Sequence, residues 1–154
     1  MQLAADTTKP GIARAAALSR LAQRPSSNTL NEASRYFSDS DPLVRCAAVE
    51  EFEVVDPAQR LQILLPLSSD PSKSVRMTVA PMLSAVDMRS LPGEQRTQLS
   101  GLFSEYVASM RANADMPENL VSLGLFYMNR REAPLAESAY RDALRLDRQF
   151  IQHI

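Results

Sequence analysis

The stretch that decides the fold is residues 41–49, which read Asp-Pro-Leu-Val-Arg-Cys-Ala-Ala-Val. Aspartate followed by proline is typical of a helix start, because the carboxylate suits the free N–H groups there and proline needs no hydrogen bond of its own. The apolar positions that follow recur at helical spacing and share one face: Val44, Ala47, Ala48, Phe52 and Val55. The stretch therefore predicts an amphipathic helix whose small residues let a neighbouring helix approach closely.

The same pattern occurs three times along the chain. Residues 13–18, 44–49 and 75–80 align without gaps, and their arginines, Arg14, Arg45 and Arg76, follow one another at a spacing of 31 residues. A proline turn precedes each copy, and an apolar residue follows each at Leu21, Phe52 and Leu83. A fixed period of this length is typical of repeat proteins, in which each unit buries its apolar face against its neighbours.

Two further helical segments lie between these copies. Residues 26–37 place Leu30, Ala33 and Phe37 on one face, and residues 57–67 do the same with Leu61, Leu64 and Leu65. Each repeat is therefore predicted to be a helical hairpin. The expected fold class is all-α, a right-handed α-α superhelix (solenoid) of antiparallel helix hairpins.

The pattern changes after Asp87. Leu91-Pro92-Gly93 predicts a break, and a long helix is expected from Glu94 to near Asn113. Its predicted apolar stripe is Leu99, Leu102, Phe103, Tyr106, Val107 and Met110. We expect three regions: residues 1–87 with about three repeats, the first truncated; residues 88–116 as a connecting long helix; and residues 117–154 as a single unit.

These motifs resemble two known repeat families. Residues 41–45 match the Asp-Pro-x-Val-Arg opening of HEAT-like repeats of the bilin-lyase type, residues 70–76 match it with two extra residues, and the first copy lacks the aspartate. Residues 117–150 resemble one tetratricopeptide repeat (TPR). The structural positions that carry this second resemblance are Leu120, Leu123, Gly124, Tyr127, Ala136, Tyr140 and Ala143.

The TPR resemblance has two departures and two implications. Leu120 replaces the family's tryptophan and Arg148 its closing proline. The next helix is expected to start at Gln149, with Phe150 and Ile151 available as a cap. Because the first helix of a TPR lines the concave face, the resemblance also implies a partner-binding groove formed by Glu118, Val121, Leu125, Met128 and Asn129.

Composition excludes several classes of partner. The chain has 154 residues, 45% hydrophobic and 23% charged, and its 17 basic and 18 acidic residues leave a formal net charge of −1. That balance does not favour nucleic acid or an anionic membrane surface. No apolar run approaches the roughly 20 residues that span a bilayer, and residues 1–10 lack the pattern of a signal peptide. We expect no nucleic-acid partner and no membrane insertion.

Few residues invite a catalytic or metal-binding interpretation. Cys46 takes a position where sister repeats have Ala15 and Met77, so we interpret it as a packing residue. His153, the only histidine, lies at the terminus. The seven methionines fill core positions better than they would ligate haem. The sequence therefore predicts no catalytic residue, no metal site and no cofactor in this chain.

The three repeat arginines have two possible roles. One is an anion-binding ladder along the repeats. The other, which we favour, is structural: each arginine reaches a loop carboxylate such as Asp39, Asp41 or Asp70, or caps the carbonyls of an adjacent turn.

The order of the motifs adds one more resemblance. HEAT-like repeats, then residues 104–107, 115–118 and 136–147, resemble the C-terminal part of bacterial multihaem cytochrome c-like proteins with HEAT and TPR repeats. That resemblance implies a periplasmic parent protein that binds haem elsewhere; without it we expect a cytoplasmic protein. Two functions follow: a non-catalytic scaffold that binds a protein, a peptide or another domain of the same polypeptide, or an accessory domain of an exported electron-transfer protein. Cys-x-x-Cys-His motifs encoded upstream would decide for the second.

Overall fold

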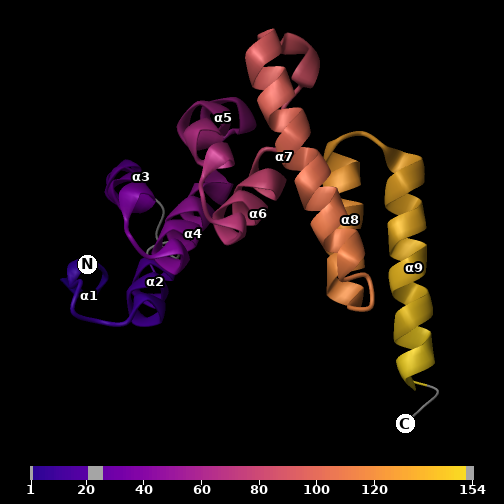
Figure 1. Cartoon of the computed structure of the whole chain (residues 1–154), viewed down its shortest axis with the longest axis horizontal. Coiled ribbons are helices and arrows are strands. Elements are labelled where there is room, and N and C mark those ends of the chain that lie inside the picture. The colour runs from indigo at the N-terminus through magenta and orange to yellow at the C-terminus, as the bar shows by residue number, and fades with distance from the viewer. Residues whose placement is uncertain (1, 21–25, 152–154) are drawn as a thin grey trace. The chain divides into compact units, whose positions relative to one another are not determined.

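The computed structural model describes residues 2–20 and 26–151 (Figure 1). Within these residues the regular structure is entirely helical, with nine α-helices, four 3₁₀ helices and no strand. The expectation of an all-α fold is therefore confirmed. The chain forms two compact units, Met1–Leu83 and Ser84–Ile154. The long helix that we expected to connect two regions belongs to the second unit together with the last two helices.

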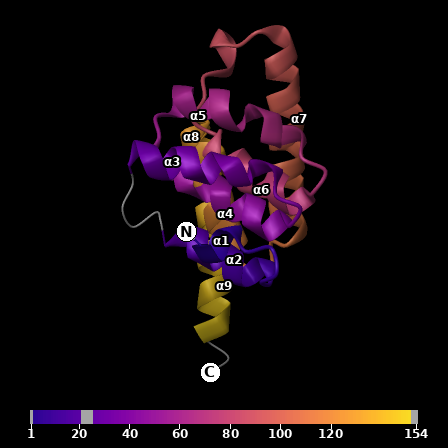
Figure 2. The same cartoon turned by 90° about the vertical axis from the view of Figure 1, so that its left-hand side faces the viewer.

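The first unit is built from short helices in two rows. Its elements are α1 Gln2–Ala5, α2 Gly11–Ser19, α3 Ser27–Ser34, η2 Arg35–Ser38, α4 Pro42–Glu50, η3 Glu51–Val54, α5 Pro57–Leu64, η4 Leu65–Ser69 and α6 Lys73–Met82. Helices α2, α4 and α6, the three copies of the repeat, pack side by side in chain order, and α3 and α5 form the other row (Figures 1 and 2). The core between the rows includes Leu18, Tyr36 and Val44.

Helix α4 forms where the sequence predicts it. The Asp41 side chain accepts a hydrogen bond from the Leu43 N–H at 2.9 Å, and Pro42 occupies the first turn. On the predicted apolar face, Val44 and Ala48 are fully buried. Leu21, the apolar residue that follows the first copy of the repeat as Phe52 follows the second, lies outside the described residues. His153 lies outside them as well.

The repeat arginines join successive repeats through buried ion pairs. Arg14 donates through Nη1 and Nη2 to the two carboxylate oxygens of Asp39, and its Nε donates to the Ala4 carbonyl at 2.9 Å. Arg45 also donates to both carboxylate oxygens of its aspartate, Asp70, but through Nε and Nη2, with Nε–Oδ2 and Nη2–Oδ1 distances of 2.9 and 2.8 Å. In both pairs the aspartate follows the arginine by 25 residues. Each pair therefore links one copy of the repeat to the turn that opens the next.

Each of these turns is also held by the arginine that follows it. The Nη1 of Arg45 donates to the Asp39 carbonyl at 2.7 Å, and the Nη1 of Arg76 donates to the Asp70 carbonyl at 2.7 Å. Arginines 14 and 45 are thus used inside the first unit, with side chains only 5% and 11% exposed. The structural role that we favoured for them fits these contacts, and an anion ladder would have to break them.

The pairing changes how the aspartates respond to pH. Burial alone would raise the pKa of Asp70, but hydrogen bonds from Arg45 and from the Ser72 N–H outweigh burial, so its pKa lies below the ordinary value. The pKa of Asp39 is lowered in the same way by Arg14 and the Asp41 N–H. Because the folded pKa is the lower one, the stability these groups contribute is present above the ordinary carboxylate pKa and is lost as pH falls through the folded value.

Two expected helices of the first unit are wrong in their extent. We predicted single helices over residues 26–37 and 57–67, whereas α3 and α5 end at Ser34 and Leu64 and continue as 3₁₀ helices. In α5 the cause is Pro66, which has no N–H to donate to the fourth carbonyl before it, so the last turn tightens. The tightened turn of α3 has no proline, and nothing in the structure explains it.

The second unit contains η5 Met88–Ser90, α7 Gly93–Ala112, α8 Pro117–Asn129 and α9 Ala133–Ile151. Phe126 of α8 lies at the centre of an aromatic cluster with Phe103 and Tyr106 of α7, at ring-centroid distances of 5.3 and 5.0 Å. Helices α8 and α9 run side by side as a hairpin (Figure 1). Gly124 lets them approach, because a Cβ there would lie 2.4 Å from the Tyr140 ring.

The expected new helix at Gln149 is wrong. Helix α9 runs without interruption from Ala133 to Ile151. The reason is that Arg148 stands where the resemblance calls for proline, and arginine continues a helix that proline would end. The predicted capping role of the Phe150 and Ile151 side chains lies outside what the structure describes.

Glu51 provides a test of the first unit's pH response. This glutamate is 6% exposed, and burial, aided by the charge of Glu50, raises its pKa to about 6. A raised carboxylate pKa means that the folded chain holds the proton more tightly than the unfolded chain, so this group lowers stability as pH rises through the window from its ordinary value of 4.5 to about 6. We expect Glu51→Gln to raise the free energy of unfolding near neutral pH by about 1 kcal/mol.

Urea unfolding of both proteins across this window measures the effect. The gain should shrink as pH falls and vanish near pH ~4, where Glu51 is protonated in both states. Glu53→Gln, at an exposed position of the same 3₁₀ helix, is the control and should change stability little. An equal gain in stability from both variants, or a gain from Glu51→Gln that does not depend on pH, would contradict the raised pKa of Glu51.

Candidate interaction surface

Helix α8 carries apolar side chains on two opposite faces. One face is buried in the second unit and includes Leu123 and Phe126. The other presents Val121, Leu125 and Met128, which are 42%, 57% and 53% exposed. Their spacing of four and three residues places them in one stripe along the helix. We call these three residues the α8 stripe.

Local sequence explains why the stripe is held outward. Pro117 opens α8, and Gly124 and Leu120 turn toward the interior, the glycine against Tyr140 of α9. With α7 and α9 covering the remaining sides of α8, the stripe is the face that neither helix covers in this unit. Single exposed apolar residues are common on protein surfaces, but several in a row on one helix are typical of a surface that another molecule covers.

The other two residues of the predicted groove behave differently. Glu118 is exposed near the start of α8 and supplies a negative charge beside the stripe. Asn129, at the end of α8, is exposed as well, but its Nδ2 donates to the Ser84 Oγ at 2.9 Å. Asn129 therefore helps to hold the chain before η5 against the end of α8, and we assign it a structural contact as well as a place beside the stripe.

The five residues of the predicted groove all lie on helix α8. Two cavities of the second unit were not anticipated from the sequence. One, of about 590 Å³, lies against α7 and α8 and is lined by residues that include Phe103, Phe126 and Arg111. The other, of about 430 Å³, is lined by residues 85–89 and 129–131. Of the five predicted groove residues, Asn129 alone is among those that line these cavities.

The first cavity is lined by aromatic rings and by two arginines, Arg111 and Arg130. The Arg111 Nη2 donates to the Tyr127 hydroxyl at 3.1 Å, and the Arg130 guanidinium lies 5.0 Å from the centre of the Phe103 ring. Stacking of a guanidinium on an aromatic ring fixes the position of the charge. Arg130 also lines the second cavity, where its neighbour Arg131 joins it. The consecutive arginines at 130 and 131 were the sequence signal for a charged site in the α8–α9 turn, and the fold shows which cavities they line.

Cys46 is half-buried in α4 with a free thiol. Among residues 2–20 and 26–151, no three His, Cys, Asp or Glu side chains gather as a metal ion would require. In the same residues, no helix combines the length and the apolar character needed to cross a membrane.

Comparisons of this chain with protein-family models, with curated proteins and with solved structures found no match. The resemblances to HEAT-like repeats, to a TPR and to multihaem cytochrome c-like proteins therefore stay predictions from the sequence.

Proposed function

We propose that this chain is a non-catalytic interaction scaffold that binds a partner protein, or another domain of the same polypeptide, through the α8 stripe. The observation that carries the proposal is the exposure of Val121, Leu125 and Met128 together on one helix face. An apolar helix face of this kind suits an apolar helix or strand presented by a partner. Glu118 at one end of the stripe adds a charge that would favour a partner with a basic residue there.

The repeat architecture supports a scaffold role. In our proposal the first unit is a run of HEAT-like hairpins, the α8–α9 hairpin is TPR-like, and the chain belongs to the right-handed solenoids. The support is that two arginine–aspartate forks recur with the same separation of 25 residues, as repeated units stacked in the same way would require. Repeats of this type build extended concave surfaces that bind partners.

The test is a binding experiment with the double variant Leu125→Glu/Met128→Glu. The tagged chain is used to capture proteins from the source cells, captured proteins are identified, and each is then measured with purified components. We expect the double variant to weaken binding of a genuine partner by at least about tenfold, because two charges would be buried against an apolar surface. The variant should stay folded, since both positions are exposed.

Leu144→Glu is the matched control, because Leu144 is an apolar residue of α9 in the same unit and is 59% exposed. This control should bind the partner as the unmodified chain does. Equal binding by the double variant and the control would reject the α8 stripe as the binding surface. The absence of any partner that binds the purified chain would reject the scaffold role.

A further inference from the structure

The cavity lined by residues 85–89 and 129–131 has a strongly cationic lining. Arg89, Arg130 and Arg131 line it, together with one carboxylate, Asp87. Three guanidinium groups against one carboxylate leave two positive charges in excess around a space of about 430 Å³. The chain as a whole has a net charge of −1, so this concentration of positive charge is local and belongs to the cavity.

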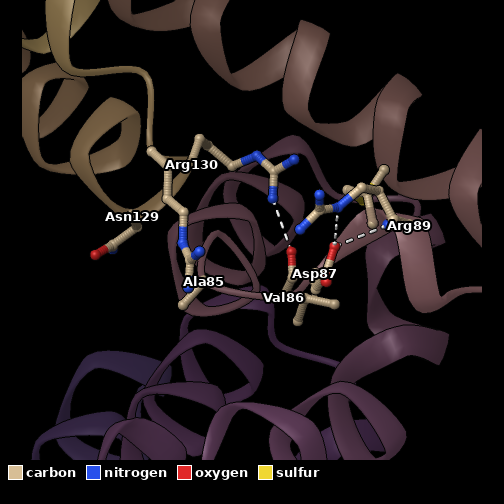
Figure 3. Close-up of a pocket in the computed structure, with 8 residues that line it drawn as sticks. Ala85, Val86, Asp87, Arg89, Asn129 and Arg130 are labelled. Carbon is tan, nitrogen blue, oxygen red and sulfur yellow. Dashed lines mark hydrogen bonds and ion pairs between the residues drawn. The ribbon is translucent and has the colours of Figure 1, made fainter.

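Two of the three arginines are held in place by the protein. The Nη1 of Arg130 donates to the carbonyls of Val86 and Ser84 at 2.8 and 3.2 Å, and Figure 3 shows this side chain directed toward Val86. The Arg89 side chain and backbone N–H both donate to the Asp87 carboxylate, at 3.2 and 3.0 Å, as Figure 3 also shows. These hydrogen bonds leave the remaining donors of both guanidinium groups free for a bound molecule.

Asp87 does not cancel the positive charge of the cavity. Hydrogen bonds from Arg89 lower the pKa of Asp87, with a smaller contribution from the charge of Arg131, so its carboxylate stays ionised and paired with Arg89. The excess charge therefore rests on Arg130 and Arg131. The Arg131 side chain makes no hydrogen bond or ion pair with the rest of the described chain, which leaves its guanidinium available.

The backbone of Arg131 supplies an independent observation. Its φ is 60°, and it is the one non-glycine residue with positive φ in the described part of the chain. Arg131 ends α8 in the arrangement that glycine usually adopts: its N–H donates to the Met128 carbonyl at 3.0 Å, and the Glu132 N–H donates to the Tyr127 carbonyl at 2.9 Å. A side chain larger than hydrogen is strained in this conformation. A long cationic residue at a position that favours glycine, on the wall of a cationic cavity, points to a role for that cation.

We propose that this cavity binds a phosphate monoester, with Arg130 and Arg131 as the residues that neutralise it. A phosphate monoester carries between one and a half and two negative charges at neutral pH, which matches the excess charge, whereas a single carboxylate would leave part of it unbalanced. Guanidinium groups bind phosphate oxygens through paired, charge-assisted hydrogen bonds. The volume leaves room for the group that carries the phosphate, and Val86 and Met88 provide apolar contact for it.

The experiment is a calorimetric titration of the full chain with three probes: inorganic phosphate, a short phosphoserine peptide and the same peptide without phosphate. We expect saturable binding of the first two and none of the third. Tighter binding of the phosphopeptide than of phosphate would identify the source as a modified protein, and equal binding would identify a free phosphorylated molecule. A lack of saturable binding of either phosphate probe up to about 10 mM would overturn the proposal.

Two variants with opposite expected effects test the residues. Arg131→Gly should weaken phosphate binding by about tenfold while the melting temperature stays the same or rises, because glycine relieves the positive φ. Asp87→Asn should tighten binding by several fold, since it removes the only negative charge of the lining and keeps a side chain able to cap η5.

Arg141→Gln is the matched control, because Arg141 is an exposed arginine of α9 in the same unit. Its phosphate binding should equal that of the unmodified chain. Equal weakening by Arg131→Gly and Arg141→Gln would show that only general charge attraction is present, and the site would be rejected. The inference is independent of the α8 stripe: Leu125→Glu/Met128→Glu should leave phosphate binding unchanged, so either proposal can fail alone.

Discussion

Replacing Arg45 by methionine is expected to lower the free energy of unfolding by about 3–5 kcal/mol, the loss typical of breaking a buried ion pair from one side. The two side chains of the Arg45–Asp70 pair are 11% and 6% exposed. Without the guanidinium, the Asp70 carboxylate stays buried with the Ser72 N–H as its remaining hydrogen-bond donor. The Asp39 carbonyl also loses its hydrogen bond from Arg45. Urea unfolding followed by circular dichroism measures the change.

Two further variants test whether the loss of stability comes from a charge left unpaired in the interior or from the loss of any ion pair. Arg141→Met breaks the exposed Glu137–Arg141 pair of α9, whose side chains are 69% and 65% exposed, and should cost less than about 0.5 kcal/mol. The double variant Arg45→Met/Asp70→Leu should recover part of the loss, because no unpaired charge is then left in the interior. If Arg45→Met costs no more than Arg141→Met, the buried fork does not stabilise the first unit.

Replacing Gly124 by leucine is expected to lower the free energy of unfolding by about 3 kcal/mol, at the upper end of the range for overpacked interiors. The first atom of the new side chain would already lie 2.4 Å from Cε1 of Tyr140, and three more carbons follow it. Helices α8 and α9 would have to separate or Tyr140 would have to leave its place. Thermal unfolding of the purified chain measures the loss.

Gly101 supplies the opposite control within the same unit. It lies inside α7 and is exposed, and a Cβ at this position would have no neighbouring atom within 4 Å. Gly101→Ala should therefore raise stability by about 0.5–1 kcal/mol, the gain in helix propensity alone. The pair Gly124→Leu/Tyr140→Ala should lose less than the sum of its single variants, because the two side chains compete for one space. A stabilising Gly124→Leu would show that α8 and α9 are not in close contact there.

The candidate surface was predictable in part. The spacing of Val121, Leu125 and Met128 along one helix placed them on a common face, and all three are exposed in the structure. The two cavities were not predictable. The smaller one joins residues 85–89 to residues 129–131, segments about forty positions apart in the chain, and no local pattern states that they meet. Nor does local sequence reveal that Arg131 has a positive φ, because its neighbour Arg130 is the same residue type and has a φ of −78°.

What the sequence by itself determined is the set of helices and their period. Caps such as Asp41-Pro42 and the apolar spacing depend on neighbours within one or two helical turns, so local rules are enough to predict them. The recurrence of Arg14, Arg45 and Arg76 is found by aligning the sequence with itself, which needs no tertiary contact. The break expected at residue 148 was wrong because it came from the family resemblance; the local rule, applied to Arg148 itself, predicts that the helix continues, as it does.

Only the tertiary structure decided which partner each group takes. Arg14 had Asp39, Asp41 and Asp70 as candidate carboxylates, and it pairs with Asp39, while Asp41 caps α4 and Asp70 binds Arg45. The choice depends on how the turn of one repeat stacks on the helix of the one before it. Packing between segments 25 residues apart brings each arginine to its aspartate. Because the pair is then buried, a charge left without its partner is costly, and the arginine and aspartate are stable only when both are present.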